Sequence, residues 1–151
     1  MTSYSELINA NRIKTGQFSE KQIHDCLQLA ERDIETANKI VNDDSDWGFS
    51  IAYNAMLQAL RGLMFSKRYR ATGEGQHATT IQFAQIALRD EFSTTLEFLD
   101  RMRRKRNRTV YDTAGLVSKK EADEAIATAE IFIRAIVKTP KNKRALKKIA
   151  S

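Results

Sequence analysis

Apolar residues recur at three- and four-residue intervals through most of this chain, and this spacing limits the fold more than any other feature. The first long example is Ile23, Leu27, Ala30, Ile34, Ala37 and Val41. Such spacing places apolar side chains along one side of an α-helix. The chain has one proline and six glycines, too few breakers for the many tight turns of an all-β fold. We therefore predict an all-α protein, an up-and-down bundle of four or five helices.

Serine and aspartate residues mark where the helices are expected to begin. Ser19 with Gln22, and Ser118 with a glutamate three residues later, have the spacing of a capping box. Asp46 is expected to cap a second helix that runs to about residue 70. A shorter helix is predicted over residues 79–88, and another from about residue 93 into a basic segment. No stretch shows the sustained period-two alternation that indicates a strand.

The length of 151 residues suits one domain with one core. We divide the chain into an N-terminal arm or short helix (1–18), a helical bundle (19–138) and a basic tail (139–151). The single cysteine, Cys26, cannot form an internal disulfide, and with two histidines it supplies no structural zinc site. Neither metal nor cofactor is expected. The chain lacks a signal-like apolar start and a long apolar span, so we expect a cytoplasmic protein without membrane contact.

Positive charge gathers in two places in this chain, whose formal net charge is +6. The tail holds one cluster, at residues 141–148. The other cluster comprises Arg101, Arg103, Arg104, Lys105, Arg106 and Arg108. Basic clusters on a small protein favour a polyanionic partner such as RNA or a nucleotide. The alternative is that these side chains are only solvated and have no partner.

The segment RNRTVYD at residues 106–112 combines three types of phosphate-binding group. On a helix Asn107 and Tyr111 lie one turn apart on the same face, and Arg106 lies about 100° round from Asn107. A guanidinium fork, an amide and a phenol can together hold a phosphate. The alternative is that Arg106 lies on the surface while Tyr111 fills the core.

Three stretches of the chain, in this order, resemble the HEPN superfamily. WGFSIAYNAMLQALRGLMFSKRY at 47–69 is similar to the family's aromatic- and alanine-rich helix. EGQHATTIQFA, which contains His77, resembles its Gly/His loop. RRKRNRTVYD resembles its R-N-x-x-x-H or R-N-x-x-x-Y-D motif. The resemblance spans about residues 20–138.

The resemblance implies a homodimer in which the two copies of the motif meet in one cleft. Many HEPN proteins are metal-independent ribonucleases, and others bind nucleotides or pair with a nucleotidyltransferase in toxin–antitoxin systems. Carried over, it implies that Arg106 stabilises charge on the phosphate and that Asn107 positions it. It makes Arg106, Asn107 and Tyr111 the candidate catalytic residues. The residues expected to bind nucleic acid are Arg101, Arg103, Arg104, Lys105 and Arg108.

Tyr111 stands where the nucleases of this family have histidine. A tyrosine hydroxyl, with an ordinary pKa of about 10, is almost wholly protonated at neutral pH, whereas a general base works best with a pKa near the operating pH. We therefore expect RNA or nucleotide binding with weak or absent cleavage. The alternatives are an active ribonuclease toxin and an interaction subunit partnered with a nucleotidyltransferase or antitoxin. His77 could replace the missing base, or it could cap the helix that follows. Trp47 and Tyr53 are expected in the core or at an interface.

Overall fold

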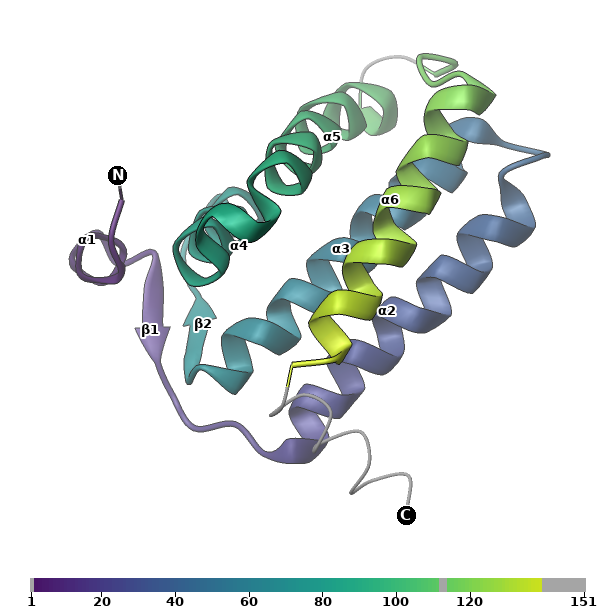
Figure 1. The fold of residues 1–151 in the computed structure, drawn as a ribbon. Coiled ribbons are helices and arrows are strands. Elements are labelled where there is room, and N and C mark those ends of the chain that lie inside the picture. Colours follow the sequence, from purple (N-terminus) through teal and green to yellow (C-terminus); the bar gives the residue numbers. More distant parts are fainter. Residues whose placement is uncertain (1, 112–113, 140–151) are drawn as a thin grey trace.

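A computed structural model of the chain shows helices packed around one central helix (Figure 1). The structure describes residues 2–111 and 114–139, without the side chains of residues 109–111. It confirms the all-α bundle and adds a small sheet at one side. The elements are α1 (Tyr4–Asn9), β1 (Ile13–Thr15), α2 (Glu20–Ile40), α3 (Ser45–Ser66), β2 (Tyr69–Ala71), α4 (Gln76–Leu88), a 3-10 turn (Arg89–Phe92), α5 (Ser93–Tyr111) and α6 (Lys119–Val137).

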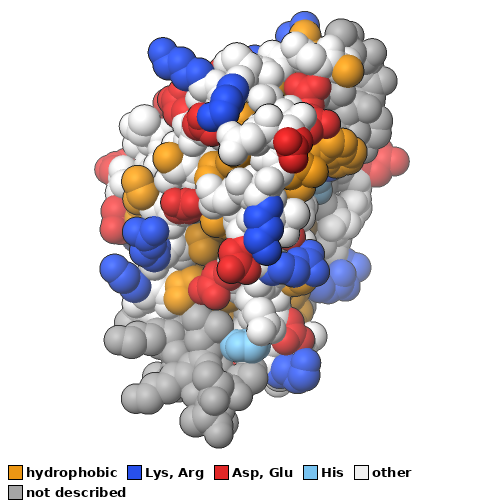
Figure 2. Space-filling view, turned by 90° about the vertical axis from the view of Figure 1, so that its right-hand side faces the viewer, with side chains coloured by type: hydrophobic (Ala, Val, Ile, Leu, Met, Phe, Trp, Pro, Cys, Tyr) orange, Lys and Arg blue, Asp and Glu red, His pale blue; other side chains and the backbone are white. Residues whose placement is uncertain are grey.

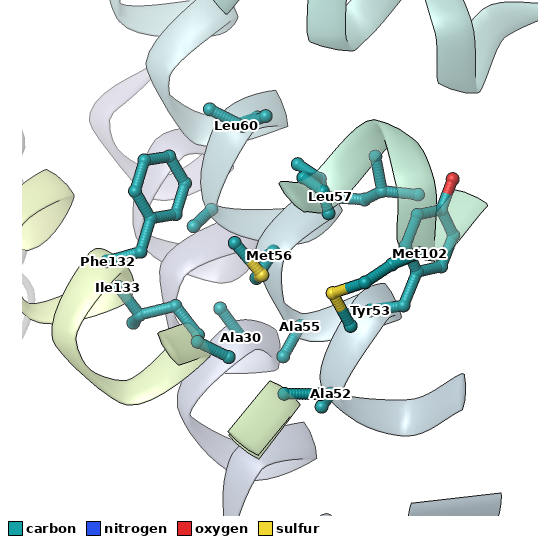
Figure 3. Packing of buried hydrophobic residues seen from close by; sticks show 14 of the residues in the cluster. Ala30, Ala52, Tyr53, Ala55, Met56, Leu57, Leu60, Met102, Phe132 and Ile133 are labelled. Carbon is teal, nitrogen blue, oxygen red and sulfur yellow. The ribbon is translucent and has the colours of Figure 1, made fainter. Parts of the chain in front are cut away.

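The central helix is α3, with α2 and α6 on one side and α4 and α5 on the other (Figure 1). Small residues let its neighbours come close: a Cβ atom on Gly62 would lie 3.0 Å from Cδ2 of Leu27 on α2. Figure 3 shows Met56 of α3 among side chains of α2 and α6, including those of Ala30 and Phe132. The alanine-rich face of α3 therefore packs inside the chain.

Helix α5 begins at Ser93, as predicted, and two other helices begin at the predicted capping boxes. At the start of α2 the hydroxyl of Ser19 accepts from the backbone N–H of Gln22 at 3.1 Å, and the Gln22 side chain accepts from the Ser19 N–H at 2.8 Å. At the start of α6 the corresponding distances between Ser118 and Glu121 are 3.1 and 3.3 Å. Both predicted capping boxes are confirmed.

The start of α3 differs from the prediction that Asp46 is its cap. Asp44 is the N-cap, and its Oδ1 accepts from the N–H of Trp47 at 3.0 Å. The carboxylate of Asp46 instead accepts from the N–H groups of Gly115 (2.5 Å) and Val117 (3.1 Å). Because both of its oxygens are used in this way, Asp46 connects the start of α3 to the loop that precedes α6.

The end of α3 and the start of α4 also differ from the prediction. α3 stops at Ser66 rather than near residue 70, and β2 follows it. β2 pairs antiparallel with β1, with Ile13 opposite Ala71. Three residues are too few to show a period-two pattern, so the sequence did not indicate these strands. α4 begins at Gln76, earlier than the predicted residue 79.

The sheet attaches the N-terminal segment to the bundle. Leu7, Ile13, Met64 and Phe83 form a small buried cluster beside the sheet. The segment predicted as an arm or short helix thus contains one short helix and one strand that pack on α3 and α4. The predicted basic tail lies outside the described residues, except for Thr139. Within the described ranges, no helix combines the length and apolar character needed to cross a membrane.

Candidate functional site

Helix α5 presents its basic residues on two different sides. One side faces the start of α4 across a cavity of about 300 Å³, which is lined by Gly75, Gln76, His77, Ala78, Arg103, Arg106 and Asn107. The other side, with Leu116, lines a cavity of about 260 Å³ and carries Arg101, Arg104, Lys105 and Arg108. Residues three or four apart share a helix face, which is why the predicted cluster divides in this manner. We call the first the Arg106 cavity.

The ion pairs of α5 leave Arg106 apart from its neighbours. Asp100 accepts from Arg103 at 3.0 Å and from Arg104 at 2.6 Å, and Lys105 pairs with Glu121 of α6. Arg106 forms no ion pair with any carboxylate among the described residues. Its Nε is buried and lacks a hydrogen-bond partner there. Burial of an unsatisfied donor costs about 1–3 kcal/mol, and more for a charged group, so Arg106 is the cation in this segment best prepared to receive an anion.

Tyr53 of α3 connects Arg106 to His77. The Arg106 guanidinium carbon lies 5.6 Å from the centre of the Tyr53 ring, in cation–π contact. The Tyr53 ring is fully buried beside Met102, and its hydroxyl points away from the centre of the core cluster (Figure 3). That hydroxyl lies 3.1 Å from Nδ1 of His77 on α4. Three helices therefore meet at this site through three side chains.

The environment shifts the pKa of both partners in the Tyr53–His77 pair. Burial raises the pKa of the Tyr53 hydroxyl, although Arg106 and Arg103 oppose that shift. Burial also lowers the pKa of His77, and the nearby charges of Arg106 and Arg103 lower it further. These shifts favour the neutral form of both groups at pH 7, so the two arginines are the main source of positive charge in the cavity.

The prediction that His77 caps α4 is wrong. The N-cap is Gly75, whose φ is 68°, and no side chain hydrogen-bonds to the cap position. A positive φ is readily adopted only by glycine, while the Nδ1 of His77 is engaged by Tyr53. The first-turn N–H groups of α4 are therefore left without a side-chain cap at the wall of the Arg106 cavity. Helix N-termini of this kind favour anions.

A larger cavity, of about 450 Å³, lies between α3 and α4 and shares Gln76 and His77 with the Arg106 cavity. Its other lining residues include Asn54, Leu57, Gln58, Arg61 and Arg70. We call it the α3–α4 cavity. Local sequence patterns do not indicate this cavity, because its residues come from two helices and a strand whose mutual placement follows only from the folded chain.

The other residues singled out in the sequence lie in different environments. The side chain of Tyr111 lies outside the described residues, although its backbone ends α5. Tyr53 is in the core, as expected, whereas Trp47 is 54% exposed. Cys26 is buried. Among the described residues, no three His, Cys, Asp or Glu side chains are grouped closely enough to hold a metal ion.

Among the described residues, the face on the right-hand side of Figure 1, where α2 lies, shows no continuous basic patch. Figure 2 shows that acidic and basic side chains are interspersed over it, with small apolar areas between them. A cavity between α2 and α6 includes Glu31, Glu35 and Glu130 in its lining. The basic residues that line cavities beside α5 thus stand apart from this mixed face.

The bundle and its basic helix can be compared with known proteins. A family model of the HEPN domain matches residues 23–142, a range that includes α2, α3, α4, α5 and α6. A search of curated proteins finds no match. The family match covers most of the chain and includes Tyr53, His77, Arg106 and Asn107. On this ground the chain belongs to the HEPN domain family.

Proposed function

We propose that this protein is a homodimer that binds RNA or a nucleotide by its phosphate groups in the Arg106 cavity. The first turn of α4 supplies N–H groups at one wall, and Arg103, Arg106 and Asn107 supply donors at the other. His77 and Tyr53 are neutral and leave the positive field intact. A phosphate fits this set of donors better than a neutral ligand does.

One observation carries the proposal, namely the isolation of Arg106. The three cations that precede it, Arg103, Arg104 and Lys105, have carboxylate partners, whereas Arg106 has none among the described residues and its Nε is buried without a hydrogen-bond partner there. The ring of Tyr53 holds its guanidinium in place. A phosphate oxygen at this position would supply the missing acceptor and neutralise the charge.

The proposal is for binding with weak or absent cleavage, because Tyr111 replaces the histidine of the nuclease motif. One observation favours the second candidate, an active metal-independent ribonuclease: a neutral imidazole, His77, lines the same cavity as Arg106. Incubation of the dimer with total RNA and EDTA separates the two. Products ending in 2′,3′-cyclic phosphate that disappear in Arg106→Ala would favour the nuclease. Products that appear only in Tyr111→His would indicate a latent site.

The proposed biological setting is a toxin–antitoxin or defence system, with a nucleotidyltransferase or antitoxin as a protein partner. The resemblance of the sequence to the HEPN superfamily supports this setting, and the basic face of α5 would suit an acidic partner. A pull-down from the native host, analysed by mass spectrometry, tests it. Recovery of RNA without any protein partner would contradict it.

The direct test of phosphate binding is Arg106→Ala, with Arg134→Ala as the control. Both changes remove one arginine, but Arg134 lies on α6 in the cavity that contains Glu31, Glu35 and Glu130. Loss of one charged hydrogen-bonding contact should weaken binding of a short RNA about tenfold or more. The control should change it little. Equal affinities for the wild type and Arg106→Ala would refute the proposed site.

A further inference from the structure

We propose that the α3–α4 cavity binds the base of a nucleotide whose phosphate lies in the Arg106 cavity, so that the two cavities form one nucleotide site. This inference rests on the proposed function and adds the chemical class of the group next to the phosphate.

The two cavities are neighbours that share part of their lining. Gln76 and His77, the first two residues of α4, line both. His77 is also hydrogen-bonded to the Tyr53 hydroxyl, and the Arg106 guanidinium lies over the Tyr53 ring. The cavities measure about 450 and 300 Å³. One ligand that contacts the start of α4 can therefore extend in both directions, with its anionic end toward α5.

Three side-chain amides line the α3–α4 cavity, and each has one end hydrogen-bonded and one end unpaired among the described residues. The NH₂ groups of Asn54 and Gln76 donate to Asp33 and to the Gly73 carbonyl, at 2.9 and 3.1 Å. The oxygen of Gln58 accepts from Arg61 at 2.9 Å. A carboxylate or a carbonyl only accepts and a guanidinium only donates, so these partners fix how each amide is turned.

The unpaired ends are therefore two carbonyl oxygens, on Asn54 and Gln76, and one NH₂ group, on Gln58. No hydrogen bond within the described residues uses them. A cavity that offers acceptors and a donor matches the mixed donor and acceptor edge of a nucleobase. A second phosphate, by contrast, carries only acceptors and would find the two amide oxygens repulsive.

Apolar side chains line part of the same cavity. Leu57 is 4% exposed and Met64 is 1% exposed, and both line the cavity together with Phe65. The Phe65 ring is held between the Arg61 guanidinium, 5.6 Å from its centre, and the Phe18 ring, 4.2 Å away. Arg61 and Arg70 both line the cavity, and Arg61 also donates to Gln58. A second phosphate on Arg70 is the competing occupant.

The test measures the affinities of the four ribonucleoside 5′-monophosphates, ribose 5-phosphate and pyrophosphate by calorimetry. At least one nucleotide should bind more tightly than ribose 5-phosphate. Gln58→Met keeps the length of the side chain but removes the NH₂ group. It should weaken that nucleotide about fivefold, the effect of one neutral hydrogen bond, and leave ribose 5-phosphate unchanged. Gln85→Met, an exposed position on α4 outside both cavities, is the matched control.

Three results would overturn the inference while leaving the proposed function in place. All four nucleotides could bind no better than ribose 5-phosphate. Gln58→Met could weaken the sugar phosphate as much as the nucleotide. Pyrophosphate could bind more tightly than every nucleotide and lose that advantage in Arg70→Ala. The proposed function itself would fail if ribose 5-phosphate did not bind, or if it bound Arg106→Ala as well as the wild type. In that case the inference would fail too.

Discussion

Tyr53 belongs both to the hydrophobic core and to the candidate site, and two substitutions separate these roles. Tyr53→Phe keeps the buried ring beneath Arg106 and removes the hydroxyl that lies 3.1 Å from His77. It should lower the free energy of unfolding by about 1 kcal/mol, the net value of one hydrogen bond. Tyr53→Ala also removes a fully buried ring and should cost about 3–5 kcal/mol. Urea denaturation measures both, and equal losses would contradict this division.

His77 gives the proposed site a pH dependence with a definite sign. Burial and the charges of Arg106 and Arg103 lower its pKa in the unliganded protein, and a bound phosphate would favour the charged imidazolium. Binding therefore takes up a proton, and the affinity for RNA should increase as the pH falls below about 6.5, the ordinary pKa of histidine.

The groups that surround His77 decide how this pH dependence is measured. Tyr53 faces it from α3, Arg103 and Arg106 face it from α5, and Arg61 and Arg70 line the cavity that it shares. The arginines stay charged, and burial raises the pKa of Tyr53, so His77 alone among them changes charge near neutrality. Oligouridylate is a suitable probe because neither its phosphodiesters nor its bases titrate there. His77→Asn should abolish the increase, and an unchanged pH profile in this variant would contradict the assignment.

The sequence identified part of this site but not its organisation. Arg106, Asn107 and His77 could be singled out because an arginine–amide pair and a histidine in a glycine-bearing loop have recognisable chemistry. Tyr53 was expected in the core or at an interface, and local spacing does not distinguish Asn54 and Gln58 from other polar residues of a helix. Their importance depends on contacts between residues far apart in the chain, such as Tyr53 with His77, which local spacing does not encode.

Among the elements, the helices with strong local start signals were predicted most closely. The capping boxes at Ser19 and Ser118 are complete in the fold, because they need only residues within one turn. The strands β1 and β2 were missed, since each has three residues and its partner lies across the intervening α2 and α3. The choice between Asp44 and Asp46 as the cap of α3 was likewise decided by a distant partner, the loop before α6.

Asp46 should therefore stabilise the fold by connecting α3 to the loop before α6 rather than by capping α3. Its carboxylate accepts from the N–H groups of Gly115 and Val117. Asp46→Ala should lower the free energy of unfolding by about 2 kcal/mol, because hydrogen bonds to a charged group exceed neutral ones. Asp43→Ala is the control, since Asp43 is exposed in the same turn and should change the value by less than about 0.5 kcal/mol. Similar effects of the two changes in urea denaturation would contradict this role.

For the whole molecule, the distribution of charged side chains says more about ligand binding than the formal net charge of +6 does. The face on the right-hand side of Figure 1 mixes both signs (Figure 2), whereas α5 lines two cavities with arginine and lysine. If single-stranded RNA contacts several of these cations, the logarithm of its affinity should fall linearly with the logarithm of the salt concentration. The slope is about 0.7 per neutralised phosphate. Arg106→Ala should reduce the magnitude of that slope by about this amount, and Arg134→Ala should leave it unchanged.

The proposed dimer should respond to salt in the opposite direction from RNA binding. Two protomers of net charge +6 repel one another, and convergence of Arg106 from both copies on one cleft would add to that repulsion. Salt screens it over distances of about 10 Å or more, so added salt should strengthen the dimer while it weakens RNA binding. Arg106→Ala should likewise leave the dimer as stable as the wild type or make it more stable. Light scattering and sedimentation equilibrium over a salt series measure both effects. A monomer at every salt concentration would refute the proposed dimer, and dissociation of the dimer by Arg106→Ala would show that Arg106 stabilises the interface instead of repelling its copy across it.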